Sequence, residues 1–60
     1  MQYRVHPTTK FIVYLLNQPY GFVVQVHVLG KPGYPVEKYF LSLREAEPFY
    51  EQMIRKYSEV

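Results

Sequence analysis

This 60-residue chain has few side chains that could do chemistry, and they do not form a recognisable catalytic set. The serines are Ser42 and Ser58, and neither cysteine nor aspartate is available to build a nucleophile with its base and orienting group. Four glutamates, at positions 45, 47, 51 and 59, fall on the polar side of one predicted helix, which is typical of a solvated surface. We therefore expect no enzyme and no catalytic residue.

The two histidines are the remaining candidates for a metal site. His6 and His27 could share an ion only if the fold brings them together, and the sequence offers no obvious third ligand. His27 fits better as an outward-facing residue of a strand. We expect neither a metal nor another cofactor, and no small-molecule substrate.

The segment Tyr20-Gly21-Phe22-Val23 resembles the centre of the RNA-recognition signature, in which two aromatic residues two positions apart stack on bases. Gln18 stands where that signature has a basic residue, Pro19 where it has glycine, and Gln25 where it has a final aromatic. A turn glycine followed by a core strand is the better interpretation.

A helix over residues 42–57 is the most strongly indicated element. Ser42 and Glu45 form a capping box, in which each side chain can satisfy the other residue's backbone N–H. Pro48 falls on the polar side, where water can satisfy the carbonyl that it leaves unpaired. Apolar residues recur at three- and four-residue spacing along one stripe: Leu43, Ala46, Phe49, Tyr50, Met53, Ile54 and Tyr57.

Four segments have the patterns of strands, at residues 2–6, 11–16, 22–29 and 36–41. Residues 11–16 are apolar without a polar alternate, which is typical of a central strand, and the turn at 17–21 joins them to residues 22–29 as a hairpin. In 22–29, one face is wholly apolar and predicts core: Phe22, Val24, Val26 and Val28. The proline- and glycine-rich residues 30–35 predict a loop.

These elements predict an α+β fold in one small domain spanning residues 1–60. It is a meander of three or four antiparallel strands with a C-terminal helix packed on one face (β-β-β-α). Hydrophobic residues make up 48% of the chain, which is too much for a disordered tail. The apolar runs are far shorter than the roughly 20 residues that span a bilayer, so we expect no membrane contact and a cytoplasmic protein.

The junction Phe40-Leu41-Ser42-Leu43-Arg44-Glu45-Ala46 resembles the strand-to-helix junction of the small DNA-binding domains at the start of phage and transposon integrases. The resemblance implies a sheet that enters the major groove and reads bases with the face away from the helix, where Gln25, His27 and Lys38 would lie. Such sheets usually carry many more basic residues than this chain, whose net charge is +2 and whose pI is about 9.0.

The function that we expect follows from the sheet face that lies away from the helix. One helix covers one side of a sheet, and the other side keeps enough apolar surface to indicate an interface. We expect a non-catalytic regulatory module that binds a second copy of itself or another protein; a β-sheet DNA-binding protein is the alternative. Part of this surface could instead be hidden by the N-terminal segment folding back. The candidate contact residues are Tyr14, Val23, Gln25, His27, Leu29, Lys31, Tyr34, Lys38 and Tyr39.

Overall fold

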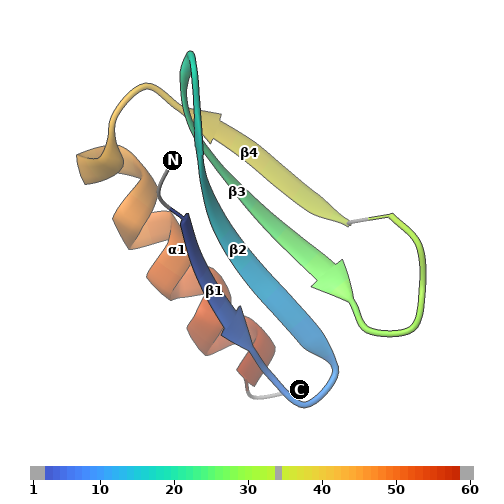
Figure 1. Cartoon of the computed structure of the whole chain (residues 1–60). Coiled ribbons are helices and arrows are strands. Elements are labelled where there is room, and N and C mark those ends of the chain that lie inside the picture. Colours follow the sequence, from blue (N-terminus) through green and yellow to red (C-terminus); the bar gives the residue numbers. More distant parts are fainter. Residues whose placement is uncertain (1–2, 34, 59–60) are drawn as a thin grey trace.

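Four strands and one helix make up the computed structural model, which describes residues 3–33 and 35–58. The strands are β1 (Tyr3–Pro7), β2 (Phe11–Gln18), β3 (Gly21–Val28) and β4 (Val36–Phe40), and they form one antiparallel sheet in the order β1-β2-β3-β4. The helix α1 (Leu43–Ser58) follows β4 and lies along one face of the sheet (Figure 1). The predicted β-β-β-α fold is confirmed, and the N-terminal strand β1 completes a four-stranded sheet.

The register fixes which residues share a face. Val13 pairs with Val26 and Leu15 with Val24, and these four side chains are at most 3% exposed beneath α1. The predicted core face of β3 is therefore the face that α1 covers. β2 is a central strand, as its apolar run predicts, and β3 is the other central strand.

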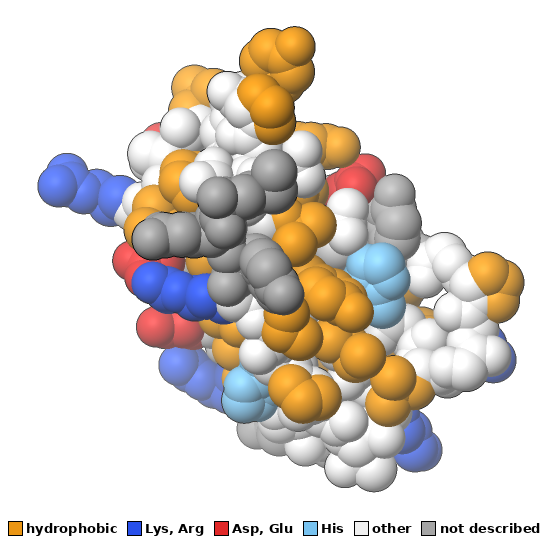
Figure 2. Space-filling view, in the orientation of Figure 1, with side chains coloured by type: hydrophobic (Ala, Val, Ile, Leu, Met, Phe, Trp, Pro, Cys, Tyr) orange, Lys and Arg blue, Asp and Glu red, His pale blue; other side chains and the backbone are white. Residues whose placement is uncertain are grey.

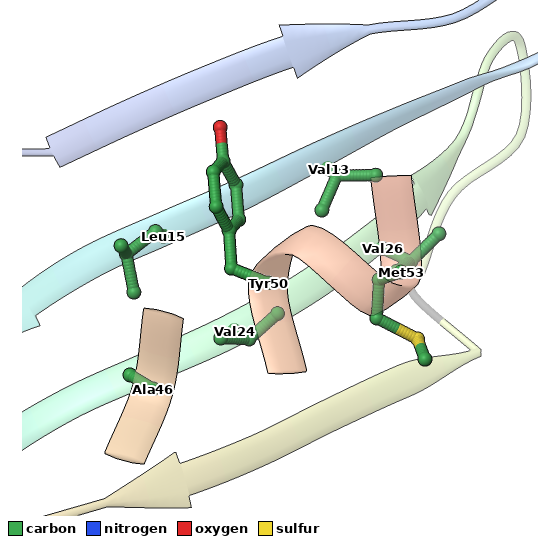
Figure 3. Packing of buried hydrophobic residues seen from close by; sticks show 7 residues of the cluster. All are labelled: Val13, Leu15, Val24, Val26, Ala46, Tyr50 and Met53. Carbon is green, nitrogen blue, oxygen red and sulfur yellow. The ribbon is translucent and has the colours of Figure 1, made fainter. Parts of the chain in front are cut away.

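The helix is held at its start and along its stripe. The backbone N–H of Glu45 donates to the Ser42 hydroxyl oxygen at 3.3 Å, which is the serine half of the predicted capping box. Every residue of the predicted apolar stripe belongs to the core or packs against it, with Ala46, Tyr50 and Met53 buried (Figure 3). Pro48 lies inside the helix and is exposed, so water can reach the carbonyl that it leaves unpaired.

β1 lies beside β2 at the edge of the sheet instead of folding back across it. Val5 pairs with Tyr14 and His6 with Val13, so the described part of the N-terminal segment widens the sheet by one strand. The expectation that this segment could hide the face away from the helix is therefore wrong for these residues, while Met1 lies outside the described residues.

Candidate interaction surface

The side of the sheet away from α1 forms a continuous surface across all four strands. We call it the open face and define it by the register partners that alternate with the core residues. Among the described residues it consists of Val5, Pro7, Ile12, Tyr14, Leu16, Val23, Gln25, His27, Glu37 and Tyr39. Figure 2 shows hydrophobic side chains gathered over the middle of the visible surface, with lysine and arginine around its margin.

A polar network crosses the centre of the open face. The Gln25 amide nitrogen donates to a Glu37 carboxylate oxygen at 2.7 Å, which leaves the Gln25 oxygen to accept from His27 Nε2 at 2.9 Å. The Tyr14 ring meets the His27 ring edge-on, with 4.7 Å between their centroids. Since Gln25 donates to the carboxylate, His27 must carry a proton on Nε2. The network therefore joins β2, β3 and β4 through side chains. Sequence analysis places Gln25 and His27 on this face but does not place Glu37 there.

Exposure varies widely over the open face. Val23 is only 1% exposed, between its register partners Leu16 and Tyr39, so little of its side chain is accessible on the open face. Tyr39 is 68% exposed and Val5 42% exposed, while Tyr14, Gln25 and His27 are half-buried. The exposed residues of the open face thus lie on the two edge strands, around a partly buried centre on β2 and β3: Val5, Pro7, Glu37 and Tyr39.

Lys38 lies on the other side of the sheet from its predicted position. It pairs with Val24 and faces α1, and its ammonium group sits 5.6 Å from the Phe40 ring centroid and 5.3 Å from that of Phe49. Cations favour the negative face of an aromatic ring, and the lysine stem can cover apolar surface at this edge of the core. Lys38 is therefore excluded as a contact on the open face.

Arg4 also faces the helix side, because it pairs with Leu15 of the core. Its guanidinium donates to a Glu47 carboxylate oxygen at 2.6 Å, and both side chains are partly exposed. Beside it, burial raises the pKa of the Tyr50 hydroxyl, and the positive charge of Arg4 opposes that shift in part. This ion pair ties β1 to α1; in sequence, 43 residues separate its members, too far for local spacing to reveal it.

The connection after β3 contains the three remaining predicted contacts. Leu29 is 47% exposed and Lys31 is exposed, so both are accessible at the end of the sheet. Tyr34 lies outside the described residues. Five members of the open face were not singled out by sequence analysis: Val5, Pro7, Ile12, Leu16 and Glu37. Strand alternation could have placed Val5, whereas the position of Glu37 depends on how β4 pairs with β3.

The two histidines lie on opposite sides of the sheet. His6 pairs with Val13 and faces the helix side, while His27 belongs to the open face, so they cannot ligate one ion. Within residues 3–33 and 35–58, no group of three metal-ligating side chains comes together. The same described residues contain no helix with the length and apolar character needed to cross a membrane.

Comparison of this chain with protein-family models, with curated proteins and with solved structures finds no match.

Proposed function

We propose that this protein is a non-catalytic binding module that acts as a homodimer, with the open faces of two copies packed against each other. The observation that carries the proposal is the one-sided cover of the sheet. In the described structure α1 packs on one face, while Val5 and Tyr39 remain 42% and 68% exposed on the other. A two-layer domain buries one face of its sheet, and a contiguous apolar patch left on the other face marks an interaction site.

The charge distribution favours a protein surface as the occupant. The described residues of the open face include one carboxylate, Glu37, and no lysine or arginine. Interface centres are depleted in charged residues and rich in tyrosine, as this face is. Glu37 lies on the edge strand β4 and is exposed, so it can stay at the wet rim of a dimer.

The size of the face suits a second copy. The molecule measures 29 × 21 × 17 Å. Its broad side spans about 600 Å² in projection, and side-chain relief brings that near the roughly 800 Å² per partner of a stable interface. A chain of 60 residues without cysteine also has little stability of its own to spare, and oligomerisation is a usual remedy in small folds.

A matched pair of lysine substitutions tests the proposal. Val5→Lys adds a charge at the rim of the open face, and Gln52→Lys adds the same charge on the exposed side of α1. Light scattering at roughly 50 µM, well above the Kd of a standard interface, should give a dimer mass for the parent and for Gln52→Lys. Val5→Lys should give a monomer.

Circular dichroism is the control that both variants remain folded. A monomeric parent at this concentration, or a Val5→Lys variant that stays dimeric, would contradict dimerisation through the open face. A parent that is monomeric alone but forms a complex of larger mass with one other protein would assign the face to a different partner.

A further inference from the structure

A pocket of about 360 Å³ lies at the end of the sheet where two connections meet. One wall is the turn between β2 and β3, and the other is the end of β4 with the residue that leads into α1; both connections lie at the upper end of the sheet in Figure 1. The pocket is lined by Gln18, Tyr20, Gly21, Phe22, Tyr39, Phe40 and Leu41.

Two lining residues of the pocket, Gly21 and Phe40, approach each other closely through their backbones. Gly21 has a φ of 144°, in the region that favours glycine, and a Cβ built there would overlap the Phe40 carbonyl oxygen. Phe22 and Phe40 are register partners directly beside this contact, and both pack against the core cluster. Part of the pocket lining therefore packs against the core, although the rest belongs to a turn and a connection.

The lining is apolar, aromatic and without a formal charge. Tyr20 is 92% exposed, Leu41 is 86% exposed and Tyr39 is 68% exposed, so three large side chains stand around the opening in contact with water. The polar groups of the lining side chains are the Gln18 amide and the two tyrosine hydroxyls. Among the residues that the structure describes, no lysine, arginine, histidine or acidic side chain lines the pocket.

We propose that this pocket binds a neutral, mainly apolar small molecule built around an aromatic ring. Its volume is within the usual range for ligand sites, and tyrosine rings favour offset or edge-on contact with another ring. The absence of charge in the lining leaves nothing to compensate a buried ionic group. The amide and hydroxyl groups can hydrogen-bond one neutral polar atom of the ligand.

The shape of the lining favours a small molecule over a peptide. Peptides bind along an extended groove or a strand edge, through repeated contacts over several residues. Here the lining is confined to residues 18–22 and 39–41, on either side of a single hollow. Tyr39 belongs to both the pocket and the open face, whereas Tyr20 lies in the turn and Leu41 follows the end of β4.

Titration of the isotope-labelled full chain with indole, followed by amide NMR shifts, tests the proposal. Saturable shifts should concentrate at Tyr20, Gly21, Phe40 and Leu41, with a Kd that is roughly millimolar or tighter. Tyr20→Ala and Leu41→Ala should each weaken binding at least fivefold. Both side chains are largely exposed, so the variants should fold.

Gln52→Lys is the matched control, because residue 52 is exposed on α1 and outside the pocket lining, so it should leave indole affinity unchanged. Indole binding that Val5→Lys abolishes, or shifts centred on Tyr14 and His27, would overturn the proposal by placing the site on the open face. Failure to saturate within the solubility of indole would also overturn it. So would an indole affinity of Tyr20→Ala and Leu41→Ala equal to that of the parent.

Discussion

Gly21 shows how one missing side chain shapes this fold. Its positive φ suits the turn after β2, and its bare Cα lets the Phe40 carbonyl approach. Gly30 has a comparable need for a positive φ, 81°, but has no atom within 4 Å of the position that a Cβ would take. Substitution of Gly30 therefore tests the cost of the backbone conformation, whereas substitution of Gly21 adds the cost of a clash.

We predict that Gly21→Ala lowers the free energy of unfolding more than Gly30→Ala does. A positive φ should cost about 1–3 kcal/mol at either position, and the clash with Phe40 should add about 1–3 kcal/mol at Gly21 alone. Urea denaturation of both variants measures the difference. Equal losses would show that the β2–β3 turn can move away from β4 without cost.

Lys38 illustrates how a charged residue can lie on the sheet face that carries the core. Its position in β4 alternates with Glu37 and Tyr39, and its ammonium reaches the rings of Phe40 and Phe49. A charge in a strand is usually taken to mark the solvent face. Here the edge strand lets the charged end stay in water while the stem lies over aromatic rings, because lysine is long enough to do both.

At the scale of elements, the helix and β3 hold the fold together. Met53 is 5% exposed and Val26 is fully buried, and both belong to the single cluster formed by α1, β2 and β3 (Figure 3). A domain of this size has only a few kcal/mol of net stability. The free energy lost when one large side chain is removed from this cluster is therefore comparable to the net stability of the whole domain.

We predict that Met53→Ala costs about 2–5 kcal/mol and unfolds much of the population at 37 °C. Gln52→Ala is the matched control, because residue 52 is the exposed neighbour on the same helix and should change stability by less than about 0.5 kcal/mol. Thermal melts by circular dichroism compare the two. A fully folded Met53→Ala at 37 °C would mean that α1 packs with another face towards the sheet.

The elements that could be predicted are those whose own residues decide them. Ser42 with Glu45 marks the start of α1, and the spacing of its apolar residues gives the buried stripe. The alternation in β3 predicted its core face, and with it the positions of Gln25 and His27. The observed bounds, including β1 at Tyr3–Pro7 and β2 extended to Gln18, differ from the predicted ones by one or two residues at strand and helix ends.

The features that sequence reasoning missed depend on pairing between distant segments. In residues 36–41 both alternating sets contain large apolar side chains, so the sequence did not decide which set faces the core. Pairing of Phe40 with Phe22 decides it, and places Lys38 towards α1 and Glu37 beside Gln25. The pocket likewise needs the β2–β3 turn to meet the end of β4. Local composition carries no signal for either.

At the scale of the whole molecule, the basic side chains lie away from the open face. Arg4 is paired with Glu47 on the helix side, Lys38 lies over the Phe40 and Phe49 rings, and the remaining basic residues of α1 are exposed on the helix. Lys10 and Lys31 lie in connections at one end of the sheet, which the Leu29 N–H to Lys10 carbonyl bond holds together. A major-groove reader that used the open face would have at most these two lysines to meet phosphates.

This distribution predicts weak binding to duplex DNA. The logarithm of affinity falls with the logarithm of salt by about 0.9 for each phosphate contact, so two lysines limit the slope to about −2. Apolar association through the open face should respond little to the same salt, since it neutralises no phosphate. Fluorescence titration with random-sequence duplex and light scattering, each in low and moderate salt, measure the two quantities on the same protein.

Charge-neutral variants locate whatever DNA binding is seen. Lys10→Gln with Lys31→Gln should flatten the salt dependence, whereas Arg44→Gln with Arg55→Gln, on the exposed side of α1, should leave it unchanged. The dimer mass should persist in all of them, because none of the four side chains lies on the open face. Tight binding by a monomer with a slope near −4, lost in Lys31→Ala and Lys38→Ala, would instead make this sheet a reader of DNA, since phosphate contacts on that scale need more cations than the two at its end.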